Sequence, residues 1–163
     1  MTSIRDFAIG VVPGLLQTAQ YGEESSGPWA LDMSAEALLQ LLQARLERQR
    51  RVLREAGTRF TAIVDESALR RVVGGPVVVQ DQLKALVTAS ELPNVAIRIV
   101  PFASGPLPVP TNKFIIPSFD VPPDVVFLET LTGRFILVRE TDLAFYHEAC
   151  ASLEGFGPAE WQL

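Results

Sequence analysis

The chain has 163 residues, a formal net charge of −5 and a single cysteine, Cys150. One cysteine excludes an intrachain disulfide and a multi-cysteine metal site. The acidic balance disfavours binding to nucleic acid, which requires basic residues against phosphates. Hydrophobic residues make up 48% of the chain, which predicts a folded domain, and no apolar run approaches the ~20 residues that cross a bilayer. We therefore expect one cytoplasmic domain over residues 1–163, with no membrane contact, metal or cofactor.

The N-terminal segment contains Arg5 and Asp6 and lacks the long apolar core of a signal peptide. A Pro-Gly pair at 13–14 predicts a turn, and a short helix is expected over residues 15–21. Residues 22–28 are rich in Gly, Ser and Glu, which predicts an exposed loop.

A long helix is predicted from Ser34, which can cap it, to Gly57, which can end it. Its predicted inner face repeats at spacings of three and four residues. This face consists of Leu38, Leu42, Leu46, Gln49 and Leu53. The segment also holds the densest basic cluster, which we interpret first as a solvated helix face and second as a surface for an acidic partner protein. The cluster consists of Arg45, Arg48, Arg50, Arg51 and Arg54.

Short β-branched segments and turns follow this helix. Residues 60–64 predict a strand, after which Asp65 opens a helical turn. Gly-Gly-Pro at 74–76 breaks that turn. A second amphipathic helix is expected to run to Ser90, and residues 95–102 predict another strand.

The C-terminal part is mostly β in its predicted structure. Residues 103–111 contain three prolines and predict a surface loop. Strands are predicted at 114–119, 125–129 and 135–138, and a final helix is expected to be capped by Thr141. Consecutive strands without crossover helices favour antiparallel pairing. The predicted class is α+β, with N-terminal helices packed on a mostly antiparallel sheet and a C-terminal helix.

Several short motifs occur in order along the chain. They are Val12-Pro13-Gly14-Leu15-Leu16-Gln17-Thr18 with Tyr21, Arg45 with Arg48-Gln49, Asp65-Glu66 with Leu69-Arg70-Arg71, Val73-Gly74-Gly75, Gln82-Leu83, Pro93-Asn94-Val95, Val100-Pro101-Phe102 with Gly105, Phe114, Pro123-Asp124-Val125-Val126, and Glu129. By their order and spacing, the chain resembles, over residues 11–154, the domain of unknown function that follows a helix-turn-helix in Scr-type antitoxin-like regulators of actinobacteria.

The resemblance implies a regulatory domain, in a family tied to development and antibiotic production, whose members often sit beside a small partner protein. It implies no catalytic residues. Those regulators carry a DNA-reading segment before the Pro-Gly-Leu-Leu-Gln motif, whereas here only residues 1–12 precede Pro13. We therefore expect a stand-alone copy without the helix-turn-helix.

Candidate catalytic side chains are few. His147 lies three residues before Cys150, which could form a metal corner or a Cys–His pair, but a histidine at the edge of an apolar helix face is the first interpretation. Asp65 and Glu66 could act as general acid and base. Capping the helix and pairing with the arginines that follow is favoured, because acidic side chains suit a first helical turn.

Glu129 is the fourth catalytic candidate, because it falls in an otherwise apolar strand. A buried carboxylate there would have a raised pKa, as functional groups often do, although an edge position or an arginine partner is favoured. Trp29, Phe102 and Phe114 could line an apolar ligand pocket with Glu129, although aromatic side chains also belong to cores.

The first functional hypothesis is a non-enzymatic regulatory or antitoxin-like domain that recognises a small apolar molecule or a partner protein, with a homodimer as an open alternative. The second is a small-molecule cyclase of actinobacterial antibiotic biosynthesis. It would work by holding its substrate in a reactive conformation inside an apolar cavity. Direct DNA binding is the third hypothesis and is disfavoured by the net charge.

Overall fold

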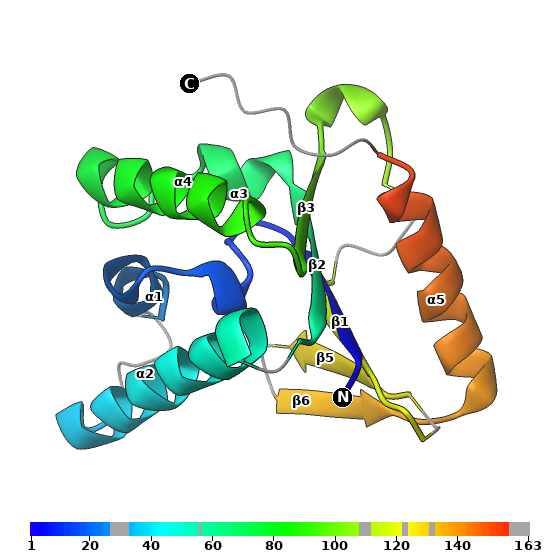
Figure 1. The fold of residues 1–163 in the computed structure, drawn as a ribbon. Coiled ribbons are helices and arrows are strands. Elements are labelled where there is room, and N and C mark those ends of the chain that lie inside the picture. Colours follow the sequence, from blue (N-terminus) through cyan, green and yellow to red (C-terminus); the bar gives the residue numbers. More distant parts are fainter. Residues whose placement is uncertain (27–32, 56, 108–111, 122–123, 131–132, 157–163) are drawn as a thin grey trace.

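The computed structural model describes the chain except for residues 27–32, 56, 108–111, 122–123, 131–132 and 157–163. The strands are β1 (Ser3–Ala8), β2 (Arg59–Asp65), β3 (Val95–Val100), β4 (Phe114–Ser118), β5 (Val126–Thr130) and β6 (Gly133–Leu137). The helical elements are η1 (Gly14–Leu16), α1 (Ala19–Ser26), α2 (Ala35–Arg50), η3 (Arg51–Glu55), α3 (Glu66–Arg70), α4 (Pro76–Ser90), η4 (Phe102–Ser104) and α5 (Glu140–Glu154). Helices α1 to α4 lie on one side of the sheet and α5 lies on the other (Figure 1). The predicted α+β class and the C-terminal helix are confirmed.

The six strands form one mixed sheet in the order β3-β2-β1-β4-β5-β6. The pairings of the consecutive C-terminal strands, β4–β5 and β5–β6, are antiparallel, as predicted, and so is the pairing β1–β4. The pairings β1–β2 and β2–β3 are parallel, because helical segments cross over between these strands. β1 itself was not predicted, since Arg5 and Asp6 interrupt its apolar pattern. It nevertheless lies at the centre of the sheet.

The predicted loop at residues 22–28 is wrong over its first five residues, where α1 continues to Ser26. Tyr21 and Gly22 are buried in this helix. A Cβ atom at Gly22 would collide with the guanidinium of Arg45. The glycine therefore makes room for an arginine and does not end the helix.

Helix α2 begins as predicted, because the Ser34 hydroxyl accepts a hydrogen bond from the backbone N–H of Ala37 at 3.2 Å. The predicted inner face is wrong at Leu46, which is 47% exposed. Arg45 turns toward the protein instead and donates hydrogen bonds to the side chains of Gln17 and Ser26. Gln49 faces inward as predicted and donates to the backbone carbonyls of Gly14 and Gln17. The other four arginines of the basic cluster are exposed.

The core has two halves, one on each face of the sheet. On the α5 side, the Phe114 ring lies 5.4 Å from that of Phe7 and 5.0 Å from that of Tyr146. Helix α5 begins two residues earlier than predicted, after the N-cap Arg139, and it buries Cys150 among its inward residues as expected. Within the described part of the chain, no helix combines the length and apolarity that crossing a membrane requires.

Candidate functional site

An ion-pair cluster lies at the β5–β6 end of the sheet. Oε2 of Glu129, on β5, accepts a hydrogen bond from Lys113 Nζ at 3.0 Å, and its Oε1 lies 3.4 Å from Arg134 Nε. The register produces this arrangement, since Arg134 stands directly opposite Glu129 on β6. The predicted arginine partner of Glu129 is therefore confirmed. The Glu129 side chain is 42% exposed, so it is not the buried carboxylate that was considered.

Asp6, in the middle of β1, is the buried carboxyl group near this cluster. Its Oδ1 is buried and has no hydrogen-bond partner in the described structure. Burial raises the pKa of Asp6 to about 6, while Lys113 lowers this pKa and Glu129 raises it further. Asp6 therefore lies within electrostatic reach of the cluster. An unpaired buried polar atom costs about 1–3 kcal/mol, so this oxygen is a candidate contact for a ligand.

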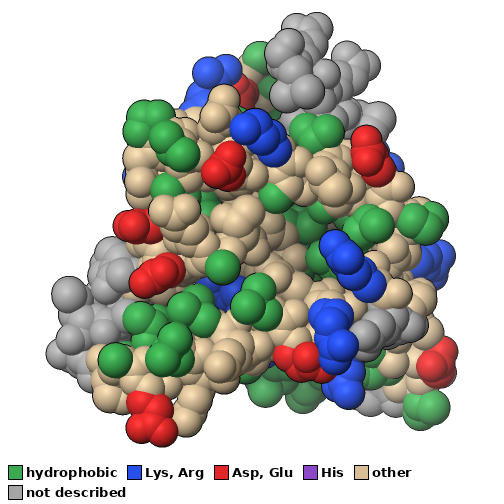
Figure 2. All heavy atoms as spheres, turned by 60° about the vertical axis from the view of Figure 1, so that its left-hand side comes forward, with side chains coloured by type: hydrophobic (Ala, Val, Ile, Leu, Met, Phe, Trp, Pro, Cys, Tyr) green, Lys and Arg blue, Asp and Glu red, His purple; other side chains and the backbone are tan. Residues whose placement is uncertain are grey.

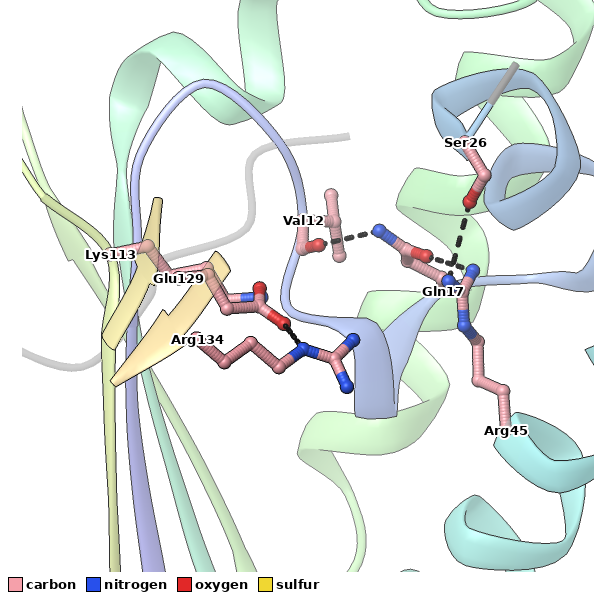
Figure 3. A network of polar contacts seen from close by, with 7 residues as sticks. All are labelled: Val12, Gln17, Ser26, Arg45, Lys113, Glu129 and Arg134. Atoms are coloured by element: carbon pink, nitrogen blue, oxygen red, sulfur yellow. Dashed lines mark hydrogen bonds and ion pairs between the residues drawn. The ribbon is translucent and has the colours of Figure 1, made fainter. Parts of the chain in front are cut away.

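A second network lies on the helical side. Arg45, on α2, donates to Gln17 Oε1 at 2.7 Å and to Ser26 Oγ at 3.3 Å. The Gln17 side-chain amide in turn donates to the backbone carbonyl of Val12 at 2.8 Å. Figure 3 shows this network and the ion-pair cluster on opposite sides of Val12.

Arg45 connects the two networks electrostatically. Its pKa is lowered, first by burial and then by Arg48, whereas Glu129 raises it. Burial also acts to raise the pKa of Glu129, but Lys113, Arg134 and Arg45 hold that pKa below its usual value. Arg45 and Glu129 thus influence each other's pKa without a direct contact between their side chains in the described structure.

We call this group the charged site; it consists of Asp6, Arg45, Lys113, Glu129 and Arg134. Lys113 and Arg134 contact Glu129 there, whereas Asp6 and Arg45 are joined to this cluster only by the electrostatic influence on their pKa values. Figure 2 brings the helical side forward and shows basic side chains gathered beside an acidic one over part of this face. The arrangement can offer an acceptor to a ligand N–H group and cations to a ligand anion.

The side chains of Gln49 and Gln82 make hydrogen bonds to the backbone of residues 14–18, the segment around η1. Gln49 donates to the backbone carbonyls of Gly14 and Gln17 at 3.1 and 2.7 Å. Gln82 is 1% exposed and makes two more hydrogen bonds to the same segment. The phenol of Tyr21 accepts from a backbone N–H of this segment at 3.3 Å. Residues from separate sequence motifs thus fix the position of η1.

Asp65 and Glu66 have the capping and pairing roles that were favoured. Asp65 Oδ1 accepts from the backbone N–H and the hydroxyl of Ser67 at the start of α3. Glu66 pairs with Arg70 at 2.5 Å and accepts the backbone N–H of Phe102 at 2.7 Å. The Phe102 N–H and then Arg70 lower the pKa of Glu66, so this carboxylate is held ionised.

The imidazole ring of His147 lies between two charged side chains, those of Arg5 and Asp124. Its Nδ1 lies 2.6 Å from an Arg5 nitrogen on β1, and its Nε2 lies 3.3 Å from Asp124 Oδ2. Burial and Arg5 lower the pKa of His147, against the opposing effect of Asp124. Burial raises the pKa of the Cys150 thiol to about 12, which keeps this sulfur protonated and a poor nucleophile. No group of three His, Cys, Asp or Glu side chains in the described ranges could hold a metal ion.

Titration of the chain's one histidine tests this arrangement directly. We expect the imidazole NMR resonances of His147 to titrate with a midpoint below 6.5, because folding favours the neutral ring. Arg5→Gln should raise the midpoint, since it removes the nearby positive charge. Arg59→Gln, at an exposed position on β2, is the matched control and should leave it unchanged. A midpoint that Arg5→Gln does not raise would contradict the arrangement.

The predicted aromatic pocket does not form around the residues proposed for it. Phe114 is 1% exposed and packs in the core on the α5 side, whereas Phe102 is 58% exposed at the surface. Glu129 alternates with Leu128, which packs on the α5 side, so Glu129 points to the opposite face. Trp29 lies outside the described residues. The structure therefore does not bring Phe102, Phe114 and Glu129 together.

The comparisons with known proteins give one match. A family model described as a domain of unknown function (DUF5753) matches residues 2–156. The matched range contains every strand and helix named above, including β1, which precedes the first motif recognised in the sequence. No curated protein and no solved structure matches the chain.

Proposed function

We propose, from the premise that the chain belongs to the DUF5753 family, that it is a regulatory domain that binds a small polar molecule at the charged site. Its context would be that of antitoxin-like regulators of actinobacteria. The observation that carries the proposal is the buried, unpartnered oxygen of Asp6. A ligand N–H group would give this oxygen the partner that the described residues do not supply.

The chemistry of the charged site favours a ligand with both a cationic and an anionic group. Asp6 accepts hydrogen bonds and, when ionised, attracts a positive charge. Arg134, whose side chain is 76% exposed, can still bind a carboxylate while it remains close to Glu129. A zwitterion such as a free amino acid carries both kinds of group. The sequence favoured an apolar ligand, whereas these side chains favour a polar one.

Binding is better supported than the cyclase hypothesis. That hypothesis needs an apolar cavity, and the aromatic residues proposed to line it are separated, with Phe114 inside the core and Phe102 at the surface. Covalent catalysis by Cys150 is disfavoured by the burial of its thiol. The charged site, by contrast, supplies complementary charges without requiring a nucleophile.

Thermal unfolding with three probe sets tests the proposal. The probes are the free amino acids, their N-acetyl derivatives and their amides, so that the cation and the anion are removed one at a time. We expect at least one free amino acid to stabilise the protein, by about 2.7 kcal/mol at a hundredfold excess over Kd, and its blocked derivatives to stabilise it less.

Variants locate the binding at the charged site. Asp6→Asn and Arg134→Gln should each reduce the stabilisation by the free amino acid, because each removes one of the charges that attract the ligand. Asp120→Asn and Arg54→Gln, which change exposed residues of the same types, should retain it. Stabilisation by none of the free amino acids, or an undiminished response in Asp6→Asn and Arg134→Gln, would overturn the proposal.

A further inference from the structure

The helical face of the sheet carries a row of apolar side chains beside the charged site. The register places Ile115, Phe127 and Ile136 opposite one another on β4, β5 and β6, and it pairs Ile115 with Asp6 on β1. Residues paired in this way present their side chains to the same face of a sheet. Asp6 shares its face with Ile4, which packs in the core half on the helical side. We call Ile115, Phe127 and Ile136 the apolar row; it begins beside the buried carboxyl group and ends at the edge of the sheet.

Exposure to solvent increases along the apolar row. Ile115 packs against the core half on the helical side. Phe127 is half-buried and Ile136 is 57% exposed, and among the described residues neither belongs to either half of the core. The described part of the fold therefore leaves apolar surface next to Asp6, whose buried Oδ1 lacks a hydrogen-bond partner there.

Charged side chains border the apolar row on the same face. Glu129 lies two residues after Phe127 on β5, and Arg134 lies two residues before Ile136 on β6. Side chains two residues apart on a strand point to the same face, so all four lie on the helical side. Figure 3 shows Glu129 and Arg134 projecting from the sheet on this side. A ligand held at the charged site would therefore have apolar side chains beside it.

We propose that the ligand of the charged site is an α-amino acid with a large apolar side chain, of the size of leucine or phenylalanine, and that this side chain covers Ile115 and Phe127. This assignment rests on the proposed function, in which a free amino acid binds with its ammonium group at Asp6. Adjacent strands lie about 5 Å apart, so Ile115 is one strand spacing from Asp6 and Phe127 is two. The side chain of a leucine or phenylalanine bound at Asp6 is long enough to contact both residues, whereas a glycine or serine bound there is too short to contact Phe127.

The apolar row also discriminates against amino acids with small or charged side chains. Removing apolar surface from water is favourable in proportion to its area, and glycine and serine offer little such area. The side-chain ammonium of lysine or carboxylate of aspartate would lose its water against Ile115 and Phe127 without gaining a partner from them. The polar groups of the ligand thus belong at the charged site, and its apolar part belongs on the row.

Isothermal titration calorimetry of the full chain tests the class of side chain. The probes are leucine, phenylalanine, glycine, serine, lysine and aspartate. We expect leucine or phenylalanine to bind with a Kd about tenfold or more below those of the other four. Phe127→Thr should reduce this preference to about threefold or less, because threonine suits a strand but offers little apolar area. Phe135→Thr is the matched control, since Phe135 pairs with Leu128 on the α5 face of the sheet, and it should keep the full preference.

Nuclear Overhauser effects between the bound leucine or phenylalanine and the Phe127 ring locate the ligand side chain in the wild-type chain, independently of how stable the variant is. Binding of glycine, serine, lysine or aspartate as tight as that of leucine and phenylalanine, and weakened by Asp6→Asn, would overturn the side-chain assignment and leave the proposed function standing. A preference that survives Phe127→Thr, or the absence of Overhauser effects to the Phe127 ring, would also overturn the assignment. If none of the six amino acids binds, the assignment falls together with the proposed function.

Discussion

We expect the Asp6→Asn substitution to raise the free energy of unfolding above that of the wild-type chain at pH 7.5. Folding raises the pKa of Asp6 from 3.8 to about 6, so the folded state binds this proton more tightly than the unfolded state. The contribution of Asp6 to the free energy of unfolding is therefore highest below pH 4, where Asp6 is protonated in both states. It falls as the pH rises through 6, because the buried carboxyl then loses its proton. The difference corresponds to about 3 kcal/mol for this fully buried group. Asparagine should recover about 2 kcal/mol of it, since its amide still lacks a partner.

Urea unfolding at pH 7.5 and pH 4 measures this effect. The gain of Asp6→Asn over the wild-type chain should be present at pH 7.5 and should shrink toward pH 4, where both side chains are uncharged. Asp120→Asn, at an exposed position, should show no gain at either pH. A gain independent of pH, or a loss at pH 7.5, would show that the Asp6 carboxyl is not destabilised by burial. A stabilised variant that no longer binds ligand would exclude unfolding as the cause of lost binding.

Gln82→Met should destabilise the fold by about 3 kcal/mol. The Gln82 side chain accepts the backbone N–H of Thr18 at 2.7 Å and donates to the backbone carbonyl of Leu16 at 2.8 Å. Methionine has a similar length but offers neither group, so two backbone atoms of the η1 segment would lose their partners. This loss is a large fraction of the 5–15 kcal/mol by which a typical domain is stable.

The matched control for this change is Gln80→Met, an exposed residue on the same helix. It should alter the free energy of unfolding by less than about 0.5 kcal/mol. Urea unfolding of both variants measures the difference. Equal stabilities for Gln82→Met and Gln80→Met would contradict the role assigned to the buried glutamine.

Sequence patterns within a few residues of each other predicted most of the helices and strands. They did not predict which elements pack against each other. Ser34 and Asp65 were identified as N-terminal signals of α2 and α3, because capping depends on residues only two or three positions apart. The rotation of α2 was predicted incorrectly, since the inward position of Arg45 depends on Gln17 and on the space at Gly22. These contacts come from a different helix and turn, so apolar periodicity alone could not reveal them.

The charged site shows the same limit. Glu129 was singled out because a carboxylate interrupts an apolar strand, and its arginine partner was anticipated. Asp6 was noted only as a charged residue of the N-terminal segment, and no role was predicted for it. Its carboxyl becomes unusual through burial by strands distant in sequence, since Ala62 and Ile115 flank it in the sheet. The apolar residues Ile4, Phe7 and Ala8 were the available signal, but the charged pair Arg5-Asp6 interrupted the pattern on which a strand prediction depends.

The central position of β1 has a consequence for the order of events during synthesis. The strand can pair with β2 once residues 59–65 have been made, but its other edge has no partner until β4, at residues 114–118, leaves the ribosome. Throughout that interval β1 is an edge strand of the nascent sheet, which has two strands until β3 is made and three afterwards. Arg5 and Asp6 place charges on that temporary edge, which is a recognised protection against pairing with other chains. The carboxyl group that destabilises the finished fold thus places a charge on the exposed edge of the incomplete one.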